Sequence, residues 1–533
     1  MNWIILVTVC TSYFYLIVKS KKAMHMLQQN LYNMNHRYIK WIVKNPISVF
    51  ISFDFLSVMF MVLAFYLNQE LWLILSSVIY VLGFFLIRMK DEKEKIHEKK
   101  PLVVTKRVLR LIFTTSVLYL IPSILIYFNK ESSLLFLLIL GIMVYFVYFI
   151  LWITNILNKP IEKCVYYYYY LKATNKLKKM SQLKVVGITG SYGKTSSKNI
   201  LSDILNVKMI AHPTPQNLNT EYGLMITINN HLDKFDEVFI AEMGAYKCGE
   251  IRTLCKMVHP SYGILTTIGT AHLESFGSEE NIQKTKFELI DSLPDDGVAI
   301  LNGDDPKQLS YKIQSKCQKI WIGIDNHEVD LYATNIHCSN NGSSFDCFVK
   351  EENQSYTFTT KLLGNHNIYN VLAGIALARE FGMNMEEIKT GVRKIKPIEH
   401  RLEIKPIGSI YMIDDAYNSN PVGAKRAVEV LDMMPGTKVV VTPGMIELGV
   451  KEKEYNKIFG MQIANVADYV ILIGEKRTQP IYQGLMESDY SKEKIYILND
   501  VKESFPLLAK LKEKEDLYAL YENDLPDSYN ENK

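Results

Sequence analysis

The chain has 533 residues, of which 48% are hydrophobic and 22% are charged, and its formal net charge is +4 at pH 7. This length predicts about three structural units. The small net charge, with basic residues gathered beside apolar segments, argues against nucleic acid as a partner. The seven cysteines form no C-x-x-C pair. Neither a disulfide framework nor a cysteine zinc site is therefore indicated, and free thiols suit a reducing compartment.

The N-terminal region, residues 1–158, holds five apolar stretches that are long enough, or nearly so, to cross a bilayer core, which takes about 20 helical residues. These predicted membrane helices are Trp3–Val18, Ile47–Leu67, Leu71–Ile87, Val108–Phe128 and Leu134–Leu157. The first lacks a basic start and a small-residue cleavage site, so we interpret it as a retained helix and not as a signal peptide. Asp54 falls in the second stretch, and we expect its carboxylate to reach the membrane interface instead of acting within the membrane.

Lysines and arginines are concentrated after the first and third apolar stretches, whereas the second and fourth connections are short and nearly uncharged. By the positive-inside rule, the N-terminus lies outside and everything after Leu157 is cytoplasmic. The sequence therefore predicts a multi-pass protein of the cell membrane. Residues 159–180 carry the run Tyr166–Tyr170 followed by lysines. They predict either a juxtamembrane amphipathic helix in contact with anionic membrane lipids or a linker helix packed on the downstream domain.

Residues Val185–Ser196 contain a β-branched run, a Gly-rich turn with the letters G-S-Y-G-K-T-S and the start of a helical pattern. This order predicts a strand, a phosphate-binding loop (P-loop) and a helix, although Ile188 stands where the usual pattern has a further glycine. Backbone N–H groups would surround phosphate oxygens, while Lys194 reaches the β- and γ-phosphates and the Thr195 hydroxyl holds Mg²⁺. The strand–turn–helix context favours this over an incidental turn. The predicted nucleotide-binding residues here are Gly190, Ser191, Gly193, Lys194, Thr195 and Ser196.

Alternating strand-like and helix-like segments follow and predict parallel α/β sheets. After the α-helical membrane region (1–158) and the linker helix (159–180), we expect a central P-loop domain over 181–398 and a smaller Rossmann-like C-terminal domain over 399–533. Polar residues follow several strands at the carboxyl edge, where open α/β sheets bind ligands. Further predicted features are an antiparallel excursion at Asp330–Thr360, a solvated helix face at 502–516, and strands at Met209–His212, Glu237–Ala241, Gly263–Ile268, Ile410–Ile413, Lys438–Thr442 and Tyr469–Ile473.

Eight short motifs in order resemble the Mur ligases, most closely the members that add D-alanyl-D-alanine. They are Thr189–Ser196, Asn217–Gly223, Ala241–Ala245, Ala271–Gly277, Leu301–Pro306, Gly364–Asn367, Asp414–Pro421 and Gly444–Gly449. The resemblance covers about residues 181–500, which correspond to the family's central ATPase and C-terminal domains. Two departures stand out. Predicted membrane helices occupy the place of the family's N-terminal UDP-sugar domain, and the C-terminal Lys-Gly-Ser stretch of the D-alanyl-D-alanine adder is absent.

The resemblance implies a reaction in which a carboxylate attacks the γ-phosphate of ATP and an amine then displaces phosphate from the acyl phosphate. It implies catalytic roles for Lys194, His272 and Lys286. Lys286 matches a lysine that many relatives carry as a carbamate, and an ordinary surface lysine is the alternative. By the same resemblance, the Mg²⁺ ligands are Thr195, Glu242 and His272; further nucleotide-binding residues are Asn302, Arg401 and Asp415; and Asn217, Asn219 and Thr220 lie beside the γ-phosphate and the acceptor carboxylate. His366 and Asn367 either cap a helix or contact the nucleotide.

The sequence and the resemblance together predict a carboxylate–amine ligase that uses ATP and Mg²⁺ at the cytoplasmic face. It joins an amino acid or dipeptide to a carboxylate of a cell-wall or surface-polysaccharide precursor, which is lipid-linked or polymeric. Addition of D-alanyl-D-alanine to a UDP-muramyl tripeptide is an alternative. A nucleotide-driven transporter or sensor is disfavoured, because no ABC-type signature is present and a transporter needs no C-terminal sheet bearing Asp414–Pro421. A scaffold without chemistry is disfavoured by the intact residues Lys194, Thr195, Glu242 and His272.

Overall fold

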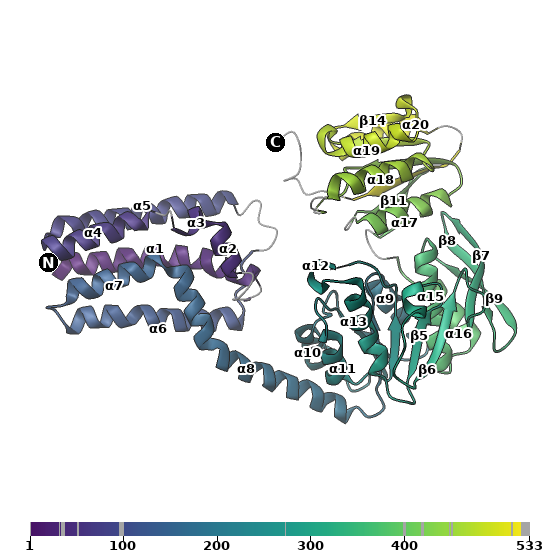
Figure 1. The fold of residues 1–533 in the computed structure, drawn as a ribbon, viewed down its shortest axis with the longest axis horizontal. Coiled ribbons are helices and arrows are strands. Elements are labelled where there is room, and N and C mark those ends of the chain that lie inside the picture. Colours follow the sequence, from purple (N-terminus) through teal and green to yellow (C-terminus); the bar gives the residue numbers. More distant parts are fainter. Residues whose placement is uncertain are drawn as a thin grey trace. The chain divides into compact units, whose positions relative to one another are not determined.

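The computed structural model describes residues 2–30, 32, 38–50, 53–94, 101–271, 273–397, 401–416, 420–446, 448, 451–512 and 515–523. The chain divides into two compact units, Met1–Tyr168 and Tyr169–Lys533. We call them the helical unit and the α/β unit. Figure 1 labels many of their elements.

The helical unit is a bundle with one shared apolar core. Tyr15, Leu73, Leu111 and Leu140 come from four different helices, and each is at most 1% exposed. The helices are α1 (Asn2–Gln29), α2 (Ile39–Lys44), α3 (Pro46–Phe50), α4 (Asp54–Leu67), α5 (Glu70–Glu94), α6 (Lys106–Phe128), α7 (Ser133–Tyr145) and α8 (Val147–Lys179).

Three of these helices, α1, α5 and α6, are long and apolar enough to cross a membrane, and α7 with α8 is a fourth candidate that is bent by 86°. The sequence predicts five spans, so the structure differs at two of them. Residues 47–67 are divided between α3 and the 14-residue α4. At 1.5 Å per residue, α4 covers only about 21 Å of the roughly 30 Å hydrocarbon core. Hydropathy could not reveal either interruption, because Phe53 and Phe146 at the two breaks are themselves apolar.

The acid predicted to reach the membrane interface is enclosed instead. Asp54 begins α4 and is fully buried, and its carboxylate pairs with the ammonium group of Lys19 from α1. Lys19 Nζ also donates to the carbonyl oxygen of Tyr145 at 2.9 Å. The expectation for Asp54 is therefore wrong. A paired acid and base carry no net charge together, which allows the bundle to bury both.

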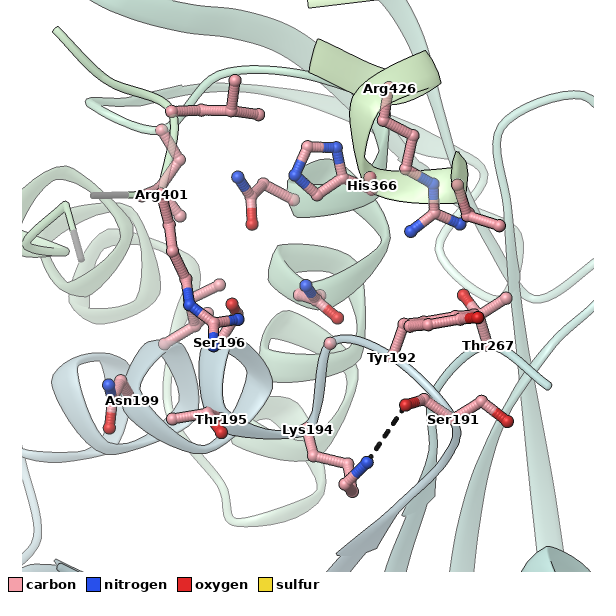
Figure 2. A pocket seen from close by; sticks show the side chains of 18 of the residues that line it. Ser191, Tyr192, Lys194, Thr195, Ser196, Asn199, Thr267, His366, Arg401 and Arg426 are labelled. Atoms are coloured by element: carbon pink, nitrogen blue, oxygen red, sulfur yellow. Dashed lines mark hydrogen bonds between the residues drawn. The ribbon is translucent and has the colours of Figure 1, made fainter. Parts of the chain in front are cut away.

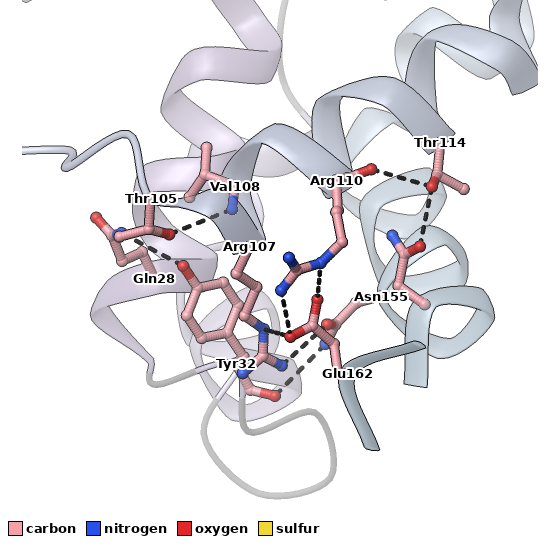
Figure 3. Close-up of polar contacts among 10 residues, drawn as sticks. Gln28, Tyr32, Thr105, Arg107, Val108, Arg110, Thr114, Asn155 and Glu162 are labelled. Carbon is pink, nitrogen blue, oxygen red and sulfur yellow. Dashed lines mark hydrogen bonds and ion pairs between the residues drawn. The ribbon is translucent and has the colours of Figure 1, made fainter. Parts of the chain in front are cut away.

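A polar cluster connects α6 and α8 with the segment after α1, as Figure 3 shows. The Arg110 guanidinium of α6 donates to both carboxylate oxygens of Glu162 in α8, at 2.7 and 2.9 Å. Arg107 lies with its guanidinium carbon 3.9 Å from the centre of the Tyr32 ring, and its Nη2 donates to Asn155 Oδ1 at 3.4 Å. Bidentate pairs of this kind fix geometry as well as contributing energy, so they hold α8 against α6.

Helix α8 runs without interruption through residue 168, where the two units divide, and through the predicted boundary at residue 158. Near its end, the carbonyl oxygen of Tyr169 accepts a hydrogen bond from Asn229 at 3.1 Å. Lys176 donates to the carbonyl oxygen of Leu232. The last turns of α8 therefore pack on the rest of the α/β unit, and the role predicted for residues 159–180 at a membrane stays a prediction.

The first part of the α/β unit is built on a nine-stranded sheet of order β2-β3-β1-β4-β5-β6-β7-β8-β9. The strands from β2 to β7 are parallel, and β7, β8 and β9 pair antiparallel, which confirms the predicted excursion at 330–360. The strands are β1 (Lys184–Thr189), β2 (Ala211–Pro213), β3 (Val238–Glu242), β4 (Tyr262–Leu265), β5 (Val298–Asn302), β6 (Gln318–Gly323), β7 (Leu331–Ser339), β8 (Gly342–Val349) and β9 (Gln354–Thr360).

Helices cover both faces of this sheet, and the alternation of side chains along β1 determines which helix packs where. Val186 and Ile188 share a core with helices α9 and α15. Gly187 faces the other way, where a Cβ atom would collide with Leu289 of α13. The helices of this part are α9 (Lys194–Leu205), α10 (Glu221–Asn230), α11 (Glu250–Val258), α12 (Leu273–Phe276), α13 (Glu279–Asp291), α14 (Pro306–Leu309), α15 (Asn365–Glu380) and α16 (Met385–Lys394).

The second part of the α/β unit has a six-stranded sheet of order β10-β11-β15-β12-β13-β14, which is parallel except for the edge strand β10. Three of its strands are predicted from the sequence, and the central strand β15 is not. The stretch 502–516, predicted as a solvated helix face, contains a helix whose Leu508 is 2% exposed. The elements are β10 (Glu403–Ile407), β11 (Ile410–Asp415), α17 (Pro421–Asp432), β12 (Thr437–Thr442), α18 (Glu452–Ala464), β13 (Tyr469–Ile473), α19 (Glu475–Glu487), β14 (Ile495–Leu498), α20 (Ser504–Leu511) and β15 (Leu517–Glu522).

Candidate functional site

A cavity of about 790 Å³ is lined by residues that end or follow strands β1, β3, β4 and β11, and by helices α9, α15 and α17. Both sheets therefore contribute their carboxyl edges, where open α/β sheets bind ligands. Figure 2 shows side chains from these elements facing one another across the space. Basic side chains outnumber acidic ones in the lining, which contains Lys194, Lys396, Arg401 and Arg426 against Glu242 and Asp415.

The loop between β1 and α9 is fixed to the end of β4. The backbone N–H of Ser191 donates to the Thr267 carbonyl oxygen at 2.8 Å, and Thr266 Oγ1 donates to the Tyr192 carbonyl oxygen at 2.6 Å. Gly190 has a φ of +154°, and a Cβ atom there would collide with Thr266. The loop thus holds its N–H groups and the N-terminus of α9 in a set position, an arrangement that favours an anionic ligand.

Lys194 lies over the same loop. Its ammonium group donates to the carbonyl oxygens of Gly190 at 2.7 Å and Ser191 at 3.2 Å, the second of which is drawn in Figure 2. Burial lowers the pKa of Lys194, the nearby Glu242 carboxylate raises it, and Arg401 lowers it. Lys194 is thereby held at the cavity wall by weak neutral acceptors, which a phosphate oxygen could replace.

The Glu242 carboxylate, at the end of β3, contacts three side chains. One of its oxygens lies 2.9 Å from the Lys198 ammonium group, and both of these side chains are 2% exposed. The other oxygen accepts from Asn219 Nδ2 at 3.0 Å and Thr195 Oγ1 at 3.2 Å. Lys198 also donates to the Gln216 carbonyl oxygen at 2.7 Å. These bonds join the first turn of α9, the end of β3 and the chain before α10 at one point.

The oxygen donors at this point suit Mg²⁺, which prefers hard oxygen ligands and is usually held by one or two carboxylates together with waters and substrate phosphates. Glu242 and the Thr195 hydroxyl lie within 3.2 Å of each other and are the two protein groups such a site needs. Among the described residues, no group of three or more His, Cys, Asp and Glu is placed to hold a metal ion by itself. The residues present therefore fit a magnesium ion bound jointly by protein and substrate.

Lys286 lies on α13 and is 3% exposed. Burial, and after it the charge of Lys194, lower its pKa to about 7, against the opposing effects of Glu250 and Glu288. At neutral pH roughly half of such amines are uncharged, which is the form that reacts with carbon dioxide. The neighbouring Lys284 is exposed.

The C-terminal sheet supplies one wall of the cavity. Arg401 lies just before β10, Asp415 ends β11 and Arg426 lies on α17. Burial raises the pKa of the Asp415 carboxyl group, and a hydrogen bond with Glu522, its neighbour in β15, lowers it. Asn420 caps α17 by accepting from the Gly423 N–H at 3.0 Å, which fixes the start of the helix that carries Arg426.

His366 and Asn367, at the start of α15, have different surroundings. The His366 imidazole faces the cavity in Figure 2. Burial, and after it the charge of Arg426, lower its pKa to about 3, so the ring is neutral at physiological pH. Asn367 also lines the cavity, but its Nδ2 donates to the Leu363 carbonyl oxygen at 2.9 Å and thereby ties the helix start to the preceding chain.

The structure brings most of the predicted site residues to this one cavity, namely Ser191, Gly193, Lys194, Thr195, Ser196, Asn217, Asn219, Glu242, Arg401 and Asp415. Gly190, Thr220, Asn302 and Lys286 are not part of the lining. Thr220 caps α10 through the Gly223 N–H at 3.3 Å, and Asn302 Oδ1 accepts from the Asp304 N–H at 2.9 Å. His272 lies outside the described residues. The roles given to these residues stay predictions.

Three basic residues of the site were not predicted from the sequence, namely Lys198, Lys396 and Arg426. Lys198 stands one turn into α9, where a lysine is ordinarily a solvated side chain, and its burial depends on Glu242 in a different strand. Arg426 lies one turn after the Asn420–Pro421 start of α17.

Residues 188–378 match the Mur ligase middle domain, and residues 400–520 match the Mur ligase glutamate ligase domain. The UDP-N-acetylmuramoyl-tripeptide–D-alanyl-D-alanine ligases of Bacillus subtilis and Escherichia coli are each 33% identical to this chain, over 285 and 297 residues. These alignments cover 53% and 55% of this chain but only 60% and 65% of the relatives.

Two solved structures are also similar. MurF from Acinetobacter baumannii gives a TM-score of 0.58 at 26% identity, covering 67% of this chain and 77% of that one. MurF ligase from Thermotoga maritima in complex with ADP gives 0.58 at 27% identity, covering 67% and 80%. The chain belongs to the Mur ligase family through its α/β unit, and its relatives within that family include MurF enzymes.

Replacing Lys198 by methionine should destabilise the middle of the central sheet, because it leaves the Glu242 carboxylate buried without a cation. We expect the local unfolding free energy to fall by about 3–5 kcal/mol. Hydrogen exchange of peptides from β1, α9 and β3 measures this loss. The control is Lys208→Met just beyond α9, whose ion pair with Glu387 is partly exposed to solvent, so a loss of about 1 kcal/mol or less is expected. Equal losses in the two variants would contradict the assignment, whereas Lys198→Met with Glu242→Gln should recover part of the loss.

Proposed function

We propose that this chain is an ATP-dependent ligase that joins a carboxylate to an amine through an acyl phosphate. The observation that carries the proposal is the convergence, in one cavity, of the Ser191–Ser196 loop, the bonded carboxylate of Glu242 and an excess of basic side chains. ATP and a carboxylate are both anions, so their reaction needs positive charge where they meet. Membership of the Mur ligase family supports the same chemistry.

In the proposed reaction, a carboxylate oxygen of the acceptor attacks the γ-phosphorus of ATP and ADP leaves. The amine nitrogen of the second substrate then attacks the carbonyl carbon, inorganic phosphate leaves and the amine loses a proton. Lys194 and the loop N–H groups would hold the β- and γ-phosphates, so the loop acts as a P-loop. Asn217 and Asn219 would orient the acceptor beside the γ-phosphate, and Arg401 would approach from the Rossmann-like C-terminal domain.

The proposed metal is Mg²⁺, bound by Thr195 and Glu242, with His272 near a second ion. Bound there, it would neutralise the charge that builds up on the transferring phosphoryl group. The asparagine and lysine bonds to Glu242 would orient its carboxylate toward the metal. Asp415 and Asn302 are the residues proposed to lie near the ribose and adenine, and Gly190, Thr220 and Lys286 are proposed members of the same site.

The acceptor is proposed to be a cell-wall or surface-polysaccharide precursor, and the amine an amino acid or dipeptide. Addition of D-alanyl-D-alanine to a UDP-muramyl tripeptide is supported by the names of the relatives. A lipid-linked or polymeric acceptor is favoured by a different observation, the three long apolar helices of the helical unit. We propose that the chain is organised as a membrane region (1–158), a linker helix (159–180), an ATPase domain (181–398) and a C-terminal domain (399–533).

The ligase proposal predicts that release of ADP and phosphate depends on both a carboxylate acceptor and an amine. UDP-muramyl tripeptide and its lipid-linked counterpart should be tested side by side with D-alanyl-D-alanine and a panel of amino acids, with amide product measured by mass spectrometry. Lys194→Ala should lower turnover by about 10²–10³-fold, because it removes a charge aimed at the transferring phosphate. Lys208→Ala, beyond the end of α9, is the control. Hydrolysis of ATP that never yields an amide would argue against the proposal.

Carbamylation of Lys286 gives a second prediction. The neutral amine attacks carbon dioxide and loses a proton, so a carbamate forms only from the uncharged lysine. With a pKa of about 7, roughly a tenth of Lys286 is neutral at pH 6 and roughly nine tenths at pH 8. We expect ¹³C NMR with labelled bicarbonate to show a carbamate signal that grows over this range. The signal should vanish in Lys286→Ala and persist in Lys284→Ala, two residues away and exposed. A signal of equal size in Lys286→Ala would refute the assignment.

The proposed location is the cell membrane, with the N-terminus outside and the α/β unit in the cytoplasm, on the strength of the positive-inside rule. A protease added to intact spheroplasts should then leave residues after 180 uncut. The same protease added to inverted membrane vesicles should release the α/β unit, detected by an antibody to that part. Release from intact spheroplasts would place the unit on the opposite side and remove access to cytoplasmic ATP.

A further inference from the structure

The Arg426 guanidinium projects from α17 into the cavity, as Figure 2 shows. Within the described part of the chain it forms no ion pair or hydrogen bond, in contrast to Lys194 and Lys198. Lys194 bonds to its own loop and Lys198 pairs with Glu242. Glu429, three residues after Arg426, instead lies 3.7 Å from exposed Lys425. A partly enclosed guanidinium, whose five N–H groups have no acceptor among the described residues, can donate them to a bound ligand.

The order of strands places Arg426 at one particular flank of the cavity. In the central sheet β3, β1 and β4 are adjacent in that order. Glu242 ends β3, the loop of Lys194 follows β1, and Thr267 follows β4. Figure 2 shows Arg426 above Tyr192 and Thr267. Tyr192 is itself bridged to Thr267. Arg426 therefore lies on the β4 side of the loop, opposite to Glu242.

A nucleoside triphosphate in this cavity has only one direction that satisfies the proposed reaction. Its γ-phosphate must meet the acceptor carboxylate and the metal ligands, which lie toward Glu242. The loop of Lys194 would hold the phosphates in the middle. The base and ribose must then extend toward the β4 flank, where Tyr192, His366 and Arg426 lie together.

The chemistry of this corner suits a flat, uncharged ring better than another anion. It offers a phenol, an imidazole and one guanidinium, and the imidazole of His366 carries no charge at neutral pH. A guanidinium can stack on a π face or donate in its plane to ring nitrogen and oxygen acceptors. Phosphate groups, by contrast, find their donors in the loop and in Lys194.

We propose that Arg426 binds the purine base of the nucleotide, and so is a binding residue of the C-terminal sheet that acts on the base and not on the phosphates. This inference rests on the proposed function, because it takes a nucleoside triphosphate as the ligand. Arg426 would thus be the residue through which the C-terminal sheet recognises the base of that nucleotide.

The test measures binding of two probes by isothermal titration calorimetry with the full chain in detergent. The probes are a non-hydrolysable ATP analogue with an imido β–γ bridge and inorganic tripolyphosphate, each with Mg²⁺. Arg426→Gln should raise the Kd of the ATP analogue about tenfold and leave the Kd of tripolyphosphate unchanged. Arg426→Lys should behave like Arg426→Gln, because lysine keeps the charge but loses the planar fork. Lys425→Gln, which removes the same charge from the exposed face of the same helix, should change neither.

Other outcomes separate the possible failures. If Arg426→Gln weakens tripolyphosphate as much as the ATP analogue, or if Arg426→Lys restores full affinity, Arg426 is a phosphate contact and the inference is wrong. An unchanged Kd for the ATP analogue in Arg426→Gln overturns it as well. If the unmodified chain binds neither probe, the proposed function fails along with it. Lys194→Ala serves as a reference, since it should weaken both probes.

Discussion

The buried contact between Glu242 and Lys198 is the interaction on which the rest of the site depends. Glu242 ends the strand next to β1, and Lys198 lies on the helix that follows β1. Their ion pair at 2.9 Å therefore ties α9 to the end of β3, and Asn219 and Thr195 donate hydrogen bonds to the same carboxylate. A carboxylate in this position would otherwise be a large cost, because burying an unpaired charge is unfavourable. The pair allows the sheet to present an oriented acid at the floor of a cavity.

Around this floor the cavity carries more positive than negative charge, and the charges come from both sheets. The charged side chains are held by two different parts of the α/β unit. Lys194 is set by a loop fixed to β4, whereas Arg401, Asp415 and Arg426 belong to the other sheet. A ligand that touches both sets joins the two parts of the α/β unit by its own binding energy.

The sequence could predict the features that depend on residues close together in the chain, but not those that depend on distant residues. The strand, turn and helix around Gly190–Thr195 could be predicted, because the backbone conformation there depends on residues that are close in the sequence. Strands with β-branched residues, such as β3, could be predicted for the same reason. Lys198 is different, since its role follows from a carboxylate in another strand. Strand β15 escaped prediction because it directly follows a stretch rich in lysine and glutamate. In the helical unit, continuous hydropathy concealed the breaks at Phe53 and Phe146, and the burial of Asp54 depended on Lys19 from a different helix.

The place of β15 in its sheet has a consequence for how this protein forms. Strands β11 and β12 do not touch each other directly, since β15 lies between them and pairs with both. Just after it, Asn523 donates to the carbonyl oxygen of Gly444 at 2.7 Å. The β11 and β12 sides of the sheet therefore cannot pair into one sheet until residues 517–522 are in place. Contacts between residues so distant in sequence form slowly. During synthesis the central sheet can already be complete while its companion still exposes two open edges, so this interval is the stage at which chaperones or premature aggregation would compete for the nascent chain.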